Sequence, residues 1–162
     1  MTVQTTYDNE QVKGLAGMKY GNGHKEIQNA VNEEAATVPF GVLMVRGSAP
    51  GKVENPNALL PTGAADDVLG VVLRTLVDET PAGVAADSAL DLMKIGQCWV
   101  LCEAAVTPGD DAFFQFTTAN AGQFRADNDG GQAAQLVRAR FETTAGAGEI
   151  ALLTLEGVAN NG

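Results

Sequence analysis

The sequence is short of positive charge. It has 10 Lys and Arg against 20 Asp and Glu, which gives a net charge of −10 over 162 residues. The basic residues are scattered singly, and no two of them are adjacent. A nucleic-acid-binding surface needs clustered basic side chains to neutralise phosphates, and docking on an anionic membrane needs them too. The composition therefore argues against direct binding to nucleic acid and against binding to a membrane.

Long apolar runs are also missing. No run reaches the roughly 18 residues that a membrane-spanning helix requires. The first residues, MTVQTTYDNEQVKG, have neither the basic start nor the apolar core of a signal peptide. We therefore expect the chain to be made and kept in a cytoplasm-like compartment, or in an assembly built there. Because 45% of the residues are hydrophobic and 19% are charged, we expect most of the chain to fold as one domain.

Cysteine is scarce, and its two occurrences, Cys98 and Cys102, flank the single tryptophan. The spacing raises the question of a metal, redox or catalytic site. In a strand, residues four apart lie about 13 Å from each other on one face, whereas a disulfide needs Cα atoms within about 7 Å. The face reads Cys98, Val100, Cys102 and Ala104, which is apolar throughout. We interpret both cysteines as buried core residues of a strand.

Histidine and serine are nearly absent. His24 is the single histidine, and serine occurs only at Ser48 and Ser88. A metal-binding barrel of the cupin type needs several histidine ligands, and a serine hydrolase needs a GxSxG turn, so the sequence argues against both enzyme classes. We therefore predict that the protein is not an enzyme, with no catalytic residue, no metal site and no cofactor.

Two loops resemble ligand-binding motifs without completing them. GSAPGKV, residues 47–53, has three residues between its glycines where a phosphate loop has four, and it ends in Val53 in place of Ser or Thr. RADNDGG, residues 125–131, would put Arg125 and Leu136 where a calcium loop needs carboxylates. We interpret the first as a turn and the second as a hairpin turn, with a weakly bound surface ion as the alternative for the second.

The sequence is rich in glycine, with 19 residues, and in short β-type runs. Residues 136–141, for example, alternate between two faces, as expected of a strand with one solvated side. Seven or eight such strands at short, regular spacing predict an all-β domain, either a jelly-roll-like sandwich or a small β-barrel. The runs that carry this prediction are VPFGVLMVRG, DDVLGVVLRTLV, GQCWVLCEAAV, AFFQFTT, GQFRAD, AQLVRARFE and EIALLTLEG.

The first 35 residues differ from the rest, because they are polar and poor in apolar clusters. We divide the chain into an extended N-terminal arm over residues 1–35 and a β-domain over residues 36–162. A short helical turn is one option inside the arm, from the spacing of Ile27, Ala30, Val31 and Glu34. Two interpretations stay open: a floppy terminus, or an arm that orders only against a partner. On the second, deleting residues 1–30 should leave a folded β-domain that binds its partner weakly.

The order of the motifs resembles that of a known family. A polar arm with an Ile–Gln–Asn–Ala–Val stretch leads into VPFGVLMVRG; then come DDVLGVVLR, GQCWVLCEAAVTPGDDAFF, GQFRAD and AGAGEIALLTL. Over about residues 26–155 this pattern is similar to the cement, or head decoration, proteins of tailed bacteriophages. The two cysteines and Trp99 depart from the family pattern, and neither departure affects a functional residue.

The resemblance implies a capsid role. It implies a small β-rich body on the outer surface of an icosahedral head, assembled in the host cytoplasm, that bridges neighbouring subunits of the major capsid protein. It also implies self-association, as a homo-dimer or homo-trimer at local symmetry axes. The arm would supply the capsid contacts through its scattered apolar side chains, which are Tyr7, Val12, Leu15, Met18, Tyr20 and Ile27.

Three other classes of protein are alternatives to a capsid cement protein. A carbohydrate-binding or tail-associated β-sandwich is the main alternative, and it requires an exposed aromatic row that includes Trp99, Phe113 or Phe116. An enzyme would need the polar clusters that the chain lacks. The major shell protein normally requires a longer chain with a long helix, and neither is present in the sequence.

Overall fold

A computed structural model describes residues 14–56, 68–75, 82–117 and 119–160. Within these ranges the chain forms ten strands and a short 3-10 turn at Asp129–Gly131, and it contains no α-helix. No helix long and apolar enough to cross a bilayer occurs in the part of the chain so described. The strands are β1 Lys19–Tyr20, β2 Glu26–Asn32, β3 Leu43–Arg46, β4 Lys52–Glu54, β5 Val68–Val72, β6 Ala89–Leu101, β7 Asp111–Gln115, β8 Phe124–Arg125, β9 Ala133–Phe141 and β10 Ile150–Asn160.

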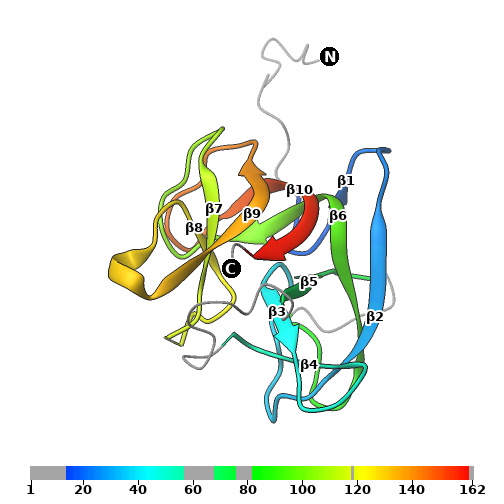
Figure 1. Cartoon of the computed structure of the whole chain (residues 1–162). Coiled ribbons are helices and arrows are strands. Elements are labelled where there is room, and N and C mark those ends of the chain that lie inside the picture. The colour runs from blue at the N-terminus through cyan, green and yellow to red at the C-terminus, as the bar shows by residue number, and fades with distance from the viewer. Residues whose placement is uncertain (1–13, 57–67, 76–81, 118, 161–162) are drawn as a thin grey trace, which may run out of the picture.

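Half of the fold is a closed barrel. Its strands follow one another in the order β2, β4, β3, β5 and β6, and β6 pairs back with β2 to close the ring. The barrel lies on the right in Figure 1 and encloses its own apolar core. That core contains Phe40, Met44, Val72, Leu90 and Leu92, all buried.

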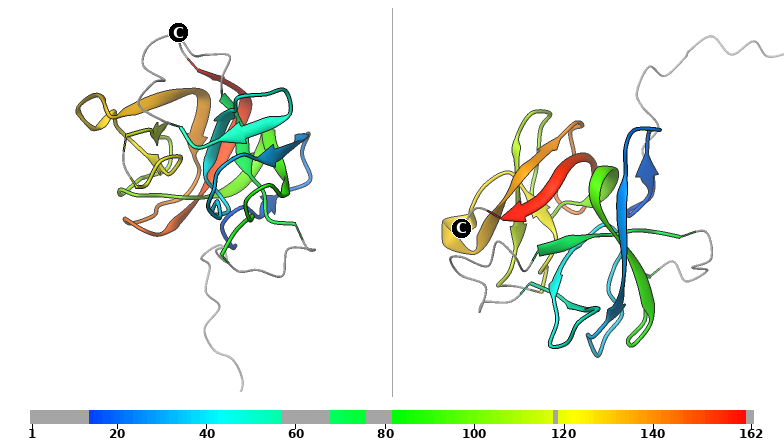
Figure 2. Two further views of the ribbon diagram at one scale, coloured as in Figure 1. Left: turned by 90° about the horizontal axis from the view of Figure 1, so that it is seen from below. Right: turned by 45° about the vertical axis from the view of Figure 1, so that its right-hand side comes forward.

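The other half continues the same sheet. Beyond residue 94, β6 pairs with β10, and the order then runs β10, β9, β7 and β8. Figures 1 and 2 show this second half beside the barrel, with the long β6 shared between them. A second apolar core fills the space, and it includes Leu43, Val71 and Met93 from the barrel strands together with Phe114 and Phe141.

Two cores explain the unbroken apolar runs in the sequence. Leu43, Val71 and Met93 belong to the second core, whereas their chain neighbours Met44, Val72 and Leu92 belong to the barrel core. Successive side chains of a strand point to opposite faces, so a strand with a core on each side has no solvated face. The all-β, jelly-roll-like fold with a small barrel is therefore confirmed.

The segment that contains Ile27 is a strand, and the suggested helical turn is wrong. β2 pairs with β6 in antiparallel register from Ile27 opposite Met93 to Val31 opposite Ala89. Ala30 faces the barrel core, while Ile27 and Val31 are exposed. The helical spacing was misleading because long-range pairing with β6 satisfies the backbone here.

The predicted boundary at residue 35 does not coincide with the edge of the sheet. β1 and β2 lie before it, and both are paired with β6. Because β2 closes the barrel, deleting residues 1–30 would remove most of a barrel strand, so we now expect that deletion to destabilise the β-domain. A separate extended arm stays a prediction for residues 1–13, which lie outside the described residues.

Candidate binding surface

The segment from Gly14 to Tyr20 lies directly on β6, over Trp99. The amide of Gly17 donates to the Trp99 carbonyl at 2.7 Å, and the Trp99 amide donates to the Met18 carbonyl at 3.0 Å. The ring of Tyr20 meets the indole edge-on, with ring centroids 6.3 Å apart. Trp99 is buried as a result, with 2% of its surface exposed. These contacts hold the segment in place before any partner binds.

Fixing this segment leaves a line of exposed apolar side chains, which we call the apolar strip. Its members are the exposed large hydrophobic residues of the described chain: Leu15 at 57%, Met18 and Tyr20 at 40%, Ile27 at 39% and Val31 at 36%. The strands β1 and β2, which carry Tyr20, Ile27 and Val31, lie along one edge of β6, since Tyr20 lies opposite Gln97, Ile27 opposite Met93 and Val31 opposite Ala89. Exposed apolar patches are typical of protein-interaction sites, so the strip is the candidate binding surface.

Four of the six predicted capsid-contact residues belong to the strip: Leu15, Met18, Tyr20 and Ile27. Tyr7 and Val12 lie outside the described residues. Val31 was missed, although the sequence contains a signal for it. Residues four apart share a face in a helix and also in a strand, so either interpretation places Val31 on the same side as Ile27.

Basic side chains accompany the strip in an otherwise acidic protein. Lys19 lies on β1, Lys25 directly before β2 and Lys94 on β6. Lys94 pairs with Glu26 at 3.6 Å, and no carboxylate among the described residues is paired with Lys19 or Lys25. Lys19 and Lys25 thus place positive charge beside the strip, near the carboxylates of Glu26 and Asp91, in a chain whose net charge is −10.

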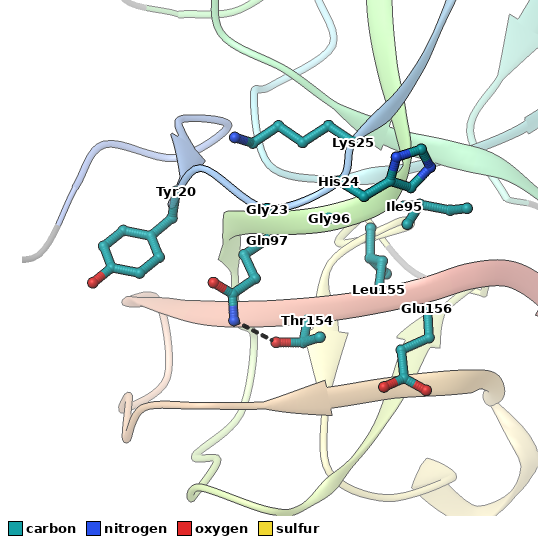
Figure 3. A pocket seen from close by; sticks show the side chains of 10 residues that line it. All are labelled: Tyr20, Gly23, His24, Lys25, Ile95, Gly96, Gln97, Thr154, Leu155 and Glu156. Atoms are coloured by element: carbon teal, nitrogen blue, oxygen red, sulfur yellow. Dashed lines mark hydrogen bonds between the residues drawn. The ribbon is translucent and has the colours of Figure 1, made fainter.

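A hollow of about 370 Å³ opens beside the strip. Figure 3 shows the Tyr20–Lys25 segment on one side of it and Thr154, Leu155 and Glu156 of β10 on the other. On the β6 side, the Gln97 side-chain amide donates to the Thr154 hydroxyl at 2.9 Å. The lining combines apolar Ile95 and Leu155 with the charged ends of Lys25 and Glu156. The hollow has room for a protruding side chain of a partner.

The loop that resembles a calcium site is occupied by its own arginine. Arg125 contacts the carboxylates of Glu103 at 2.8 Å, Asp127 at 2.7 Å and Asp129 at 2.9 Å. The buried amide of Gln115 donates to Glu103 at 3.1 Å and to Asp129 at 2.9 Å. The side-chain hydrogen bond from Arg125, followed by one from the Asp129 amide and the positive charge of Arg125, holds the pKa of Asp127 below its usual range. The guanidinium therefore takes the place that a cation would need.

Within the described residues, the His, Cys, Asp and Glu side chains form no group suited to hold a metal ion. The loop at residues 125–131 joins β8 to β9, and both of these strands pair with β7. It is thus a connection between the two neighbours of β7, and the prediction of a hairpin turn there is wrong.

The cysteine interpretation is confirmed. Cys98 and Cys102 are unpaired and buried, and both belong to the second core. Burial raises the pKa of each thiol to about 12. A thiol with so high a pKa is almost wholly protonated at neutral pH and is a poor nucleophile or metal ligand.

The aromatic row required by the carbohydrate-binding alternative is not exposed. Trp99 is buried, and Phe113 and Phe116 are half-buried. The largest aromatic side chains of the second core are Phe114, Phe124 and Phe141. The aromatic residues of this chain thus contribute mainly to packing.

Gly17 is essential for the position of the strip. Its φ is +78°, and a Cβ there would meet the Arg74 amide nitrogen at 2.7 Å and the Phe40 Cβ at 2.9 Å. We expect Gly17→Ala to cost about 1–2 kcal/mol from the backbone conformation alone and to displace the segment from Trp99. The measurement is the emission of this single tryptophan, which should shift to longer wavelength as its environment becomes more polar.

The matched control is Gly23→Ala, since a Cβ at Gly23 has no atom within 4 Å. That variant should keep the wild-type emission. An unshifted spectrum for Gly17→Ala, at unchanged protein stability, would show that the close approach at Gly17 does not hold the segment on Trp99.

These features define a class: a small all-β protein whose distinctive surface is an apolar strip suited to binding another protein. The sequence matches the family described as structural cement protein (E217 gp24/Pam3 gp6) over residues 3–156. The chain therefore belongs to this family of phage cement proteins and is a structural protein of the bacteriophage capsid.

The fold is also similar to a solved structure. A chain from the structure titled "The capsid of Myoviridae Phage XM1" superposes with a TM-score of 0.70 at 15% sequence identity, covering 98% of this chain and 100% of the other. At that identity the similarity establishes the fold alone. No curated protein matches the sequence at a significant level.

Proposed function

We propose that this protein binds the outer surface of a tailed-phage icosahedral head and clamps neighbouring major capsid subunits together. The observation that carries the proposal is the apolar strip, Leu15 to Val31, held rigidly along β6. Packaged DNA pushes the shell outward, so a protein that spans a subunit boundary adds contacts that must break before the subunits separate. Burying exposed apolar side chains supplies that contact energy, at about 25 cal/mol per Å².

Several features bear on the outer location, the self-association and the N-terminal contacts. The net charge of −10 favours a place outside the shell, away from DNA and from anionic membranes. A homo-dimer or homo-trimer at a local symmetry axis would repeat the strip and raise its effective concentration against the shell. Tyr7 and Val12 would extend the same contact in the N-terminal direction. The role is one of binding, with no catalysis and no cofactor.

The test is imaging of phage heads by cryo-electron microscopy, with and without this protein. Density for the β-fold should lie on the outside of the shell, over boundaries between major capsid subunits, with the β1–β2 side of β6 facing the shell. Heads that lack the protein should rupture at lower internal pressure or temperature. Density confined to the tail, or to the inner surface, would reject the proposal.

A further inference from the structure

The first part of β2 has no described strand on its outer side, although β4 closes the barrel at the end of β2. In β2, the Val31 amide donates to the Gly51 carbonyl at 2.9 Å, on the β4 side, whereas the Asn32 amide donates to the Ser88 carbonyl at 3.0 Å, on the β6 side. The N–H and C=O groups of successive residues alternate between the two sides of a strand. The N–H and C=O groups of Ile27 and Asn29 therefore point away from β6, as those of Val31 do. β4 pairs with β2 at Val31 and Asn32.

Beside Ile27 and Asn29, no strand among the described residues occupies that outer side. Figure 1 shows β2 at the right-hand margin of the molecule, with β6 on its inner side. Proteins normally blunt such edges with proline, with charges or by covering them. Here the stretch between Glu26 and Asn32 reads IQNAV, with no proline and no charge, and Ile27, Asn29 and Val31 are exposed. The edge has the properties of a template for a further strand.

We propose that an extended segment of a major capsid subunit adds to β2 as a new barrel-edge strand beside Ile27 and Asn29. Main-chain groups of the segment would bond the N–H and C=O groups of these two residues, which is strand addition to an exposed sheet edge. Its apolar side chains would pack on Ile27 and Val31, and its acidic side chains would lie near Lys25. This inference rests on the proposed function and specifies how the strip is engaged.

Charge decides between a capsid segment and a second copy of this chain. A two-fold pairing of β2 with itself would bring the same surface together from both copies. Two copies that each carry a net charge of −10 would repel each other in that arrangement. Lys25, directly before β2, offers an opposite charge to an acidic side chain of a partner segment, and this favours association.

The test is a proline at Asn29. Asn29→Pro removes the outward amide and places a ring at the open edge, while the inward bonds of Gln28 and Ala30 to β6 remain. Asn29→Ala is the matched control, because it also loses the side-chain bond from Asn29 to Asp91 but keeps the amide. Both variants are added to expanded heads purified without this protein, and occupancy is measured against concentration. We expect affinity to fall at least about tenfold for proline relative to alanine.

The outcomes separate this inference from the proposed function. If wild-type protein does not bind heads, the proposed function fails. If wild type binds and the proline and alanine variants bind equally, strand addition is overturned while the function stands. If the proline variant alone changes the oligomer mass measured by light scattering, the edge is occupied by a second copy, and the inference is likewise overturned.

A second measurement tests the proposal on the wild-type protein, in case the proline variant does not fold. Hydrogen exchange of wild-type protein should show the amides of Ile27 and Asn29 exchanging quickly in the free protein and slowly on heads. The amide of Gln28, bonded to β6, should be protected in both states. Fast exchange of Ile27 and Asn29 on fully occupied heads would overturn the proposal.

Discussion

Replacing Leu15 and Ile27 together with aspartate is expected to lower the affinity for expanded heads by at least about a hundredfold. Both side chains are exposed in the free protein, at 57% and 39%, so the fold should tolerate the change. Fully burying an exposed apolar side chain contributes about 1.5–3 kcal/mol, so burying the part of these two that is still exposed contributes about 2 kcal/mol in total. Placing two carboxylates in the interface adds a desolvation cost of at least about 1 kcal/mol. The total of about 3 kcal/mol corresponds to about a hundredfold, since each 1.4 kcal/mol is a tenfold change in affinity.

The control for this variant is Thr144→Asp with Ala147→Asp. Both positions are exposed in the loop between β9 and β10, away from the strip, and the pair adds the same two negative charges. Occupancy of heads is measured for both double variants, with thermal unfolding to verify the fold. Equal affinity of the two variants would mean that the strip is not the surface that contacts the capsid.

Replacing Arg125 with methionine is expected to lower the free energy of unfolding by about 3–5 kcal/mol. The side chains of Arg125 and Glu103 are 13% and 7% exposed, and their contact is 2.8 Å long. Removing the guanidinium leaves a buried carboxylate beside Gln115 without its opposite charge, and breaking a buried ion pair in this way costs several kcal/mol. Urea denaturation of the variant and wild type measures the difference.

Arg140→Met is the matched control, since Arg140 contacts Asp111 at 3.6 Å with both side chains largely exposed. An exposed pair contributes about 0–1 kcal/mol, so this variant should remain close to wild type. If Arg125→Met also loses less than about 1 kcal/mol, the network around Arg125 is not a structural support of the β7–β9 region.

The same network predicts a dependence on pH. The pKa of Asp127 is lowered from its usual 3.8 mainly by the side-chain hydrogen bond from Arg125 and also by the Asp129 amide. A carboxyl group with a lowered pKa in the folded state stabilises the fold above its usual pKa, and this stabilisation is lost as pH falls through the lowered value. The difference in stability between wild type and Arg125→Met should therefore narrow below about pH 4. A constant difference down to pH 2 would contradict this account.

The exposed strip carries a risk of aggregation that the rest of the molecule offsets. Five large apolar side chains of the described chain are exposed in or near the two strands along one edge of β6, and an open stretch of strand lies among them. A net charge of −10 opposes non-specific association in solution through mutual repulsion. The protein thus combines an apolar contact surface with a charge that discourages aggregation.

Local patterns in the sequence predicted much of the fold. The apolar face of Cys98 and Val100 indicated a buried strand, because alternation along a strand depends only on neighbouring residues. The same reasoning identified the runs that became β3, β5, β7, β9 and β10. It also identified Leu15, Met18, Tyr20 and Ile27 as apolar residues in a polar context, which the structure places in one strip.

The tertiary structure decided which segments pair and which charges meet. β1 and β2 have weak local signals, and they are strands because β6 supplies partners for their backbone groups from 58 or more residues away in the chain. Glu103 and Arg125 are likewise brought together only when β7 and β8 pair beside the loop after β6. Alternation is a local property that can be read along the chain, whereas strand order and ion pairing depend on contacts between distant segments, which no single stretch of sequence encodes.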